Sequence, residues 1–182
     1  MLGTMAGGAA DCSILIRQLR SEAQLYELQK GRRISTARVS SILANILYAS
    51  RGMGLSVGTM IVGCDDVGND SENGPPPKIF YVDNSGMRLE GNMFSAGSGS
   101  TFALAILDTE YRHDMTEDEA IALGIKAIRY ATFRDAFSGG FINVYVMTRE
   151  TGWRKVFTQD VSVAPIANNV NNNKQDTTRI QD

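Results

Sequence analysis

The sequence predicts an α+β fold, in which pairs of helices alternate with groups of strands. Stretches with the apolar period of a helix come in two successive pairs, and short runs of β-forming residues follow each pair. Each helix of the first pair carries a single apolar face, so this pair is expected to pack on one side of a sheet. The 182 residues suffice for one domain with a sizeable core.

Composition and charge exclude several classes of partner. Hydrophobic residues make up 43% of the chain and charged residues 21%, which is typical of a globular domain. A net charge of -2 predicts neither nucleic acid nor an anionic membrane as a partner, and no apolar run is long enough to span a bilayer. Cys12 and Cys64 are too few for a disulfide framework and indicate a reducing compartment. His113 is the only histidine, which disfavours a histidine-based triad or metal site, and we predict no metal or cofactor.

A glycine turn near the N-terminus is the first candidate for a site. Gly7 and Gly8 stand between a short apolar segment and a periodic helix. Glycine leaves backbone N–H groups uncovered, and such donors ahead of a helix bind anions or, in acyl-transfer enzymes, a developing oxyanion. Taken alone, a tight turn without a ligand is the commoner explanation. The residues 2–5 are typical of the end of a strand, so we expect further sequence to precede them.

Two amphipathic helices follow the glycines. The first is expected to end at Gly31, and its apolar face consists of Cys12, Leu15, Ile16, Leu19, Ala23 and Tyr26. Ser35 is the expected N-cap of the second helix, which ends near Gly52. The apolar face of this second helix consists of Val39, Ile42, Leu43, Ile46 and Leu47.

The middle of the chain has the composition of strands and turns. The segments 57–64 and 78–83 are rich in β-forming residues. Between them, 65–77 is polar and holds three consecutive prolines, so we expect a surface loop that arose as a tolerated insertion. A hairpin turn at 83–86 is expected to lead into a strand within 87–96.

A second glycine-rich junction, 97–100, precedes the second helix pair. It is too short for a phosphate-binding loop. Ser98 is either a helix cap or a site hydroxyl, and from residue type alone the cap is favoured. The apolar positions of the helix that follows are Phe102, Ala105, Ile106 and Leu107.

The last helix opens with a capping box at Thr116 and Glu119. Gly139 or Gly140 is expected to stop it, and Gly124 on its apolar face predicts close packing against a neighbour. That apolar face consists of Ala120, Leu123, Gly124, Ala127, Ile128 and Ala131.

Asp135 lies at or near the end of this helix, where an exposed anion costs about 0.3–1 kcal/mol. It is therefore a candidate for function, although a surface ion pair with Arg134 is the alternative. Strands are expected at 142–147 and 153–159, and the Asn-rich tail at 164–182 is predicted to be disordered.

Five segments of the chain together resemble the β subunits of the 20S proteasome. Within that family, they resemble the catalytic beta type-5 group. They are LGTMAGGAADC (2–12), GLSVGTMI (54–61), YVD (81–83), GSGS (97–100) and RDAFSGG (134–140). The resemblance implies an N-terminal nucleophile hydrolase fold, a four-layer αββα sandwich of two antiparallel sheets flanked by helix pairs. The matching domain would cover 1–163 and would lack its N-terminal strands.

The resemblance also implies an activity and partners. Such subunits are threonine endopeptidases that cleave unfolded polypeptides after large apolar residues during intracellular protein degradation, in the cytoplasm and nucleus. They assemble with other β subunits in a seven-membered ring, which contacts an α ring and the opposite β ring. The nucleophile is the hydroxyl of an N-terminal threonine, and that residue's own amine, or a neighbouring water, takes up the proton, so no imidazole is needed.

The resemblance assigns roles to several residues. Gly7 matches the backbone donor of the oxyanion hole, and Ser98, Asp135 and Ser138 match the network that holds the threonine's amine, with Gly139 beside them. The substrate-binding segment comprises Met5, Ala6, Gly7, Gly8 and Ala9, in which Met5 and Ala9 match positions that line the pocket for the substrate's apolar side chain.

No residue of this sequence matches the nucleophile. Thr4 matches a strand residue beside the pocket, and the nucleophilic threonine is expected upstream of Met1. The chain therefore resembles the C-terminal three-quarters of a peptidase subunit. The alternative is a truncated, non-catalytic component of the ring, which we disfavour because losing the first strands would expose apolar edges and faces.

Overall fold

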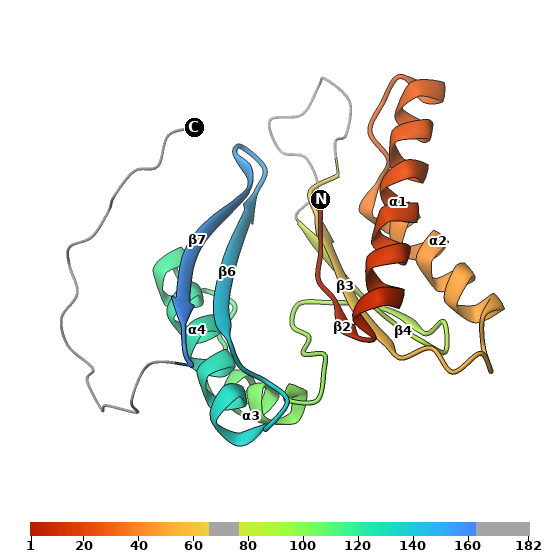
Figure 1. The fold of residues 1–182 in the computed structure, drawn as a ribbon. Helices are drawn as coiled ribbons and strands as arrows, with labels where there is room; N and C mark the ends of the chain where they lie inside the picture. Colours follow the sequence, from red (N-terminus) through yellow and green to blue (C-terminus); the bar gives the residue numbers. More distant parts are fainter. Residues whose placement is uncertain (66–76, 163–182) are drawn as a thin grey trace.

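The structure is a computed structural model and describes residues 1–65 and 77–162. Its elements follow the order β1 (Leu2–Gly3), β2 (Ala6–Gly7), α1 (Ala9–Lys30), α2 (Thr36–Ala49), β3 (Val57–Gly63), β4 (Lys78–Asp83), β5 (Arg88–Gly91), α3 (Ser100–Glu110), α4 (Glu117–Arg134), β6 (Phe141–Thr148) and β7 (Gly152–Asp160). The α+β class and the two successive helix pairs are confirmed. In Figure 1, α1 and α2 lie beside the strands β2, β3 and β4, whereas α3 and α4 lie with β6 and β7. Most of the predicted proline loop and all of the predicted tail at 164–182 lie outside the described residues.

In the first helix pair, α1 ends and α2 begins at the predicted residues. Gly31 takes a left-handed conformation with a φ of 65° and donates its N–H to the carbonyl of Glu27, which closes α1. The Ser35 hydroxyl accepts a hydrogen bond of 3.2 Å from the backbone N–H of Arg38, which caps α2. The predicted apolar faces supply the buried residues Cys12, Leu15 and Leu19 in α1, and Val39, Leu43 and Leu47 in α2.

An antiparallel sheet is built around β3. The short strands β1 and β2 both pair with one side of β3, β4 pairs with its other side, and β5 follows β4. Ala6 lies opposite Gly58 on one side, and Asp83 lies opposite Gly58 on the other. Residues along β3 alternate between buried and half-buried, which is the period of a strand with one covered face. The strand predicted within 87–96 is limited to β5.

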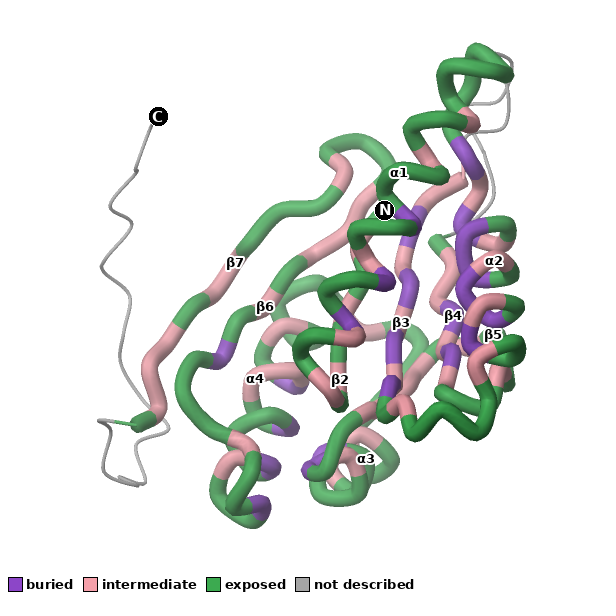
Figure 2. The backbone as a smooth tube through the Cα atoms, turned by 45° about the vertical axis from the view of Figure 1, so that its right-hand side comes forward, coloured by how far each residue is buried: buried purple, intermediate pink, exposed green. Residues whose placement is uncertain are grey.

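The helices α1 and α2 cover one face of this sheet and form the main core. Phe80 and Val82 of β4 are fully buried, as are Leu43 and Leu47 of α2. Figure 2 shows the buried positions concentrated along β3, β4 and α2. Burying a side chain of this size stabilises the fold by roughly 1.5–3 kcal/mol.

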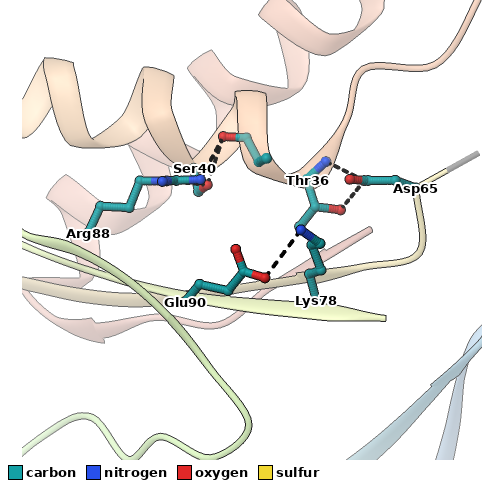
Figure 3. Close-up of polar contacts among 7 residues, drawn as sticks. Thr36, Ser40, Asp65, Lys78, Arg88 and Glu90 are labelled. Atoms are coloured by element: carbon teal, nitrogen blue, oxygen red, sulfur yellow. Dashed lines mark hydrogen bonds and ion pairs between the residues drawn. The ribbon is translucent and has the colours of Figure 1, made fainter. Parts of the chain in front are cut away.

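Polar contacts fasten α2 to the sheet (Figure 3). The Asp65 carboxylate accepts hydrogen bonds from the backbone N–H of Thr36 at 2.6 Å and from the Thr36 hydroxyl at 2.7 Å. The guanidinium of Arg88 donates to the Ser40 hydroxyl at 2.8 Å and stacks over the ring of Phe80. Because Thr36 and Ser40 are fully buried, these contacts satisfy polar groups that would otherwise lack a partner.

The second helix pair packs on the hairpin of β6 and β7. The predicted capping box at α4 is confirmed, with the Thr116 hydroxyl and the Glu119 carboxylate each bonded to the other's backbone N–H. The small core of this half is formed by Ala103, Ala127 and Ala131. The opposite face of the hairpin leaves Phe141, Tyr145 and Trp153 exposed, with the Tyr145 and Trp153 rings packed edge to face.

Two predictions about the ends and faces of these helices are wrong. The helix α4 ends at Arg134 with Asp135 as its C-cap, four to five residues before Gly139 and Gly140, because the Asp135 N–H already bonds to the carbonyl of Ala131 and the chain then becomes extended. The predicted apolar face of α3 is wrong in part: Ile106 and Leu107 do pack against the small core, but Phe102 and Ala105 are exposed. The buried residue of α3 is Ala103, because α3 presents it to α4.

The prediction of close packing at Gly124 is also wrong within the described residues. A Cβ built on Gly124 meets nothing within 4 Å there. The side chains that contact α3 come from one turn further along α4, where Ala127 and Ala131 are buried. In a separate finding, no helix in the described part of the chain is long and apolar enough to cross a membrane.

We expect Thr116→Ala to lower the free energy of unfolding by about 1 kcal/mol, because the N-cap acceptor of α4 is lost. The measurement is urea denaturation of the purified protein. Thr109→Ala is the control, since the exposed Thr109 hydroxyl donates to the carbonyl of Ala105 within α3 and caps no helix. An equal loss in both variants would contradict the assignment of Thr116 as a stabilising cap.

Candidate active site

A cavity of about 660 Å³ lies between the two halves of the chain. Its walls come from β2, β3 and β4 on one side and from α3, α4 and the segment after α4 on the other. The segment 95–100 connects the two halves of the chain and also lines the cavity. The lining residues used below are Met5, Ala6, Gly7, Ser56, Gly58, Tyr81, Ala96, Ser98, Ile128 and Ser138.

Asp135 is the centre of the polar network beside this cavity. One of its carboxylate oxygens, Oδ2, accepts hydrogen bonds from the hydroxyl of Ser98 at 2.7 Å and from that of Ser138 at 2.6 Å. The other oxygen, Oδ1, accepts from the backbone N–H of Phe137 at 3.2 Å. Only 9% of Asp135 is exposed. The three donors hold the carboxylate in one orientation.

These hydrogen bonds determine the charge state of Asp135. The pKa of its carboxyl is lowered below the ordinary value, because hydrogen bonds donated to it favour the ionised form. The bond from Ser138 has the largest effect on this pKa and the bond from Ser98 the next largest, and the Phe137 N–H acts in the same direction. Asp135 is therefore an anion at neutral pH. A negative charge beside a cavity, with two hydroxyl groups oriented by it, can bind and orient an amine.

Gly99 allows the two halves of the network to meet. It is the N-cap of α3, and no side chain caps this helix. A Cβ on Gly99 would lie 2.8 Å from the hydroxyl oxygen of Ser138 and 3.2 Å from Oδ2 of Asp135, so a larger residue would force them apart. The favoured prediction that Ser98 is a helix cap is wrong, because its hydroxyl instead bonds to a carboxylate 37 residues away.

The glycine turn is shaped by close backbone approach. Gly7 has a φ of 111°, and a Cβ on it would lie 2.1 Å from the carbonyl oxygen of Ser56. Only glycine fits both constraints. The N–H of Gly8 donates to the same carbonyl at 2.8 Å, so this donor of the turn is already engaged.

The predicted site residues fall into two groups. The residues that line the cavity are Met5, Ala6, Gly7, Ser98 and Ser138. The carboxylate of Asp135 accepts hydrogen bonds from Ser98 and Ser138. In the described structure Gly8, Ala9 and Gly139 do not line it.

Thr4 lies outside this cavity and is engaged in strand pairing. Its hydroxyl accepts from the N–H of Met60 at 3.2 Å, and its own N–H donates to the Met60 carbonyl at 2.9 Å. Thr4 is therefore held at the edge of the sheet. No three His, Cys, Asp or Glu side chains come together to hold a metal ion among the residues that the structure describes.

Sequence reasoning missed several residues of the cavity wall. Ser56, Gly58, Tyr81 and Asn84 come from β3, β4 and the adjoining turns. The signal in the sequence for Tyr81 is its place in the YVD segment, one of the five segments that carry the family resemblance. Ile128, expected in the core, is 44% exposed and lines the cavity.

Comparisons with known proteins show the family to which the chain belongs. A family model described as "Proteasome subunit" matches residues 1–147. The proteasome subunit beta type-5 of Dictyostelium discoideum is 51% identical over 160 residues, which cover 88% of this chain and 56% of that protein. The beta type-5 subunit of Spinacia oleracea is 52% identical over 161 residues, with the same coverage of 88% and 56%.

A beta type-8 subunit is similar to the same degree. That of Homo sapiens is 49% identical over 162 residues, which cover 89% of this chain and 55% of that protein. The chain thus spans little more than half the length of the curated relatives it matches. It belongs to the proteasome subunit family, as a homologue of the beta type-5 and beta type-8 subunits.

Proposed function

We propose that the whole protein is a catalytic β subunit of the 20S proteasome, a threonine endopeptidase that cleaves unfolded polypeptides after large apolar residues. The observation that carries this proposal is the anionic network of Asp135, Ser98 and Ser138 at the cavity that Gly7 also lines. An anion that can hold an amine and a glycine turn that can offer a backbone donor are the two elements that an N-terminal threonine requires.

The nucleophile in this proposal is a threonine outside the 182 residues. Thr4 does not serve, since its hydroxyl is bonded to the backbone of Met60 at the sheet edge. The threonine hydroxyl attacks the peptide carbonyl and passes its proton to the threonine's own amine, or to a water beside it. Asp135, Ser98 and Ser138 orient that amine, and the N–H of Gly7 stabilises the oxyanion of the tetrahedral intermediate.

The segment around Gly7 also forms the substrate site in this proposal. Met5 is 54% exposed at the cavity, so its flexible side chain is available to contact an apolar side chain of the substrate. Ala9 and Gly8 belong to the same segment at the start of α1 and are assigned to the site on the resemblance alone. Gly139 is likewise assigned as a neighbour of Ser138.

We propose that the complete fold is the four-layer αββα sandwich. The hairpin of β6 and β7 turns one face toward α4 and leaves Phe141, Tyr145 and Trp153 exposed on the other. An aromatic face of this kind is stable when a second sheet covers it. In this arrangement the protein occupies one position of a seven-membered β ring, between an α ring and the opposite β ring, in the cytoplasm and nucleus.

The alternative is a non-catalytic ring component without a nucleophile. The observation that favours it is that the one threonine of the glycine-turn segment, Thr4, is engaged in strand pairing. Under this alternative Asp135 would hold Ser98 and Ser138 for structural reasons only.

The experiment that separates the two is mass spectrometry of the N-terminal peptide of the subunit, taken from purified native barrels. We expect a threonine at the N-terminus, followed by a segment that leads into Leu2. The same barrels should hydrolyse a fluorogenic peptide with a large apolar residue before the cleaved bond. A native subunit that begins at Met1, or threonine-dependent hydrolysis by the 182-residue polypeptide alone, would contradict the proposal.

A further inference from the structure

The cavity has a second polar wall that the proposed mechanism does not use. Tyr81 of β4 lines the cavity, and its ring stacks on that of Phe94 with centroids 5.8 Å apart. A Cβ built on Gly58 would lie 3.6 Å from the Tyr81 hydroxyl oxygen. Gly58 lies opposite Ala6 in the sheet, so the hydroxyl stands one strand away from the glycine turn.

The Tyr81 hydroxyl is an accessible donor. Within residues 1–65 and 77–162 this hydroxyl has no hydrogen-bond partner, whereas every fully buried side-chain polar atom there has one. The hydroxyl is therefore not fully buried and is open to the cavity that Tyr81 lines. Burial of the ring, and then the charge of Asp83, raise the pKa of Tyr81 above its ordinary value. The group therefore stays protonated and able to donate at every physiological pH.

Gly58 keeps the approach to this hydroxyl open. Its backbone does not require glycine, since its φ is not among the positive values of the chain. Packing does not require it either, because an added Cβ would meet the Ala96 Cβ and the Tyr81 hydroxyl at ordinary contact distances of 3.6 Å. Because Gly58 has no side chain, the space of one Cβ beside the Tyr81 hydroxyl stays unfilled in this wall of the cavity, and the hydroxyl is not covered from that side.

We propose that Tyr81 is a positioning residue for polypeptide substrates, whose hydroxyl donates a hydrogen bond to a main-chain carbonyl of the bound peptide across Gly58. This inference rests on the proposed function for the identity of the ligand. An extended polypeptide suits the site because it offers a carbonyl acceptor at every residue whatever its side chain. The stacking on Phe94 fixes the ring, so little side-chain entropy is lost when the bond forms.

The test compares Tyr81→Phe with wild type in assembled, full-length barrels. For a peptide long enough to cross the cavity, removal of one neutral hydrogen bond should raise KM about three- to tenfold and leave kcat within about twofold. Tyr111→Phe is the matched control, because Tyr111 is an exposed tyrosine at the end of α3 outside the cavity wall. Equal effects in the two variants would overturn the inference.

A second measurement identifies the acceptor and separates the two proposals. Replacing one amide of the peptide by an ester weakens its carbonyl as an acceptor, so the ester and Tyr81→Phe should be non-additive at one position only. If the effects of the ester and of Tyr81→Phe on KM are additive at every position, the inference is overturned. A loss of thermal stability in Tyr81→Phe without a change in KM also overturns it, because the hydroxyl would then serve another part of the protein. The dissociation constant of an uncleaved peptide is measured in parallel. If Tyr81→Phe weakens binding of this peptide but neither wild-type nor variant barrels cleave any peptide, the proposed function alone is overturned. If the barrels bind no peptide, both proposals are overturned.

Discussion

Asp135→Asn in the full-length protein is expected to lower kcat for an apolar peptide about 100-fold or more, with a much smaller change in KM. The side chain keeps its shape but loses the negative charge that Ser98 and Ser138 surround at 2.7 and 2.6 Å. The amide also offers only one acceptor oxygen. If this oxygen takes the place of Oδ2, the backbone N–H of Phe137 loses its acceptor, and if the NH2 group takes that place, both hydroxyl groups lose theirs. The measurement is steady-state hydrolysis by purified barrels, together with the fraction of subunit assembled.

The control for this prediction is Asp108→Asn, which changes the same functional group on the exposed surface of α3. It should leave both turnover and assembly unchanged. If Asp135→Asn reduces assembly as much as turnover, Asp135 is a structural residue and its assignment to the active site fails.

The pH dependence of stability gives an independent check on Asp135. The pKa of this carboxyl is lowered in the folded state, so the unfolded chain binds the proton more readily. Its contribution to stability is therefore complete above the ordinary aspartate pKa of about 3.9 and is lost as the pH falls through the lower folded value. Asp135→Asn should lack this acid-dependent part, whereas at pH 5–8 the wild-type network should not titrate. A change of slope between variants within pH 5–8 would contradict the assigned charge state.

Gly7→Ala is expected to abolish most of the activity, by about 100- to 1,000-fold in kcat/KM. The added Cβ would lie 2.1 Å from the Ser56 carbonyl oxygen, so the turn must move and its backbone N–H groups move with it. The φ of 111° adds backbone strain of about 1–3 kcal/mol for any residue with a side chain. The measurements are peptide hydrolysis and thermal unfolding of the same barrels.

Gly52→Ala separates the clash at Gly7 from simple backbone strain. Gly52 also has a positive φ, of 85°, but a Cβ there meets nothing within 4 Å. This control should lower stability by about 1 kcal/mol and leave hydrolysis intact. Full activity of Gly7→Ala would show that the turn provides no donor to the reaction.

The sequence by itself determined the elements whose signals are local. A capping box needs only Thr116 and Glu119, three residues apart, and both its hydrogen bonds are present. Ser35 caps α2 and Gly31 closes α1 for the same reason, since a cap acts within one helical turn. The strand Lys78–Asp83 has the predicted bounds, because its run of β-forming residues is sharply limited. The five family segments add the family itself, which the match over 1–147 establishes.

The tertiary structure alone decided what the polar groups of these segments do. Ser98 has the residue type and place of a helix cap, and only the approach of a carboxylate 37 residues away makes it part of a network. That approach depends on Gly99, whose missing Cβ leaves room for Ser138 and Asp135. The exposed faces of α3 and the place of Tyr81 in the cavity wall have the same origin, since a side chain's surroundings across the fold are set by packing. Periodicity along the chain reports which residues share a face, but not which surface that face meets.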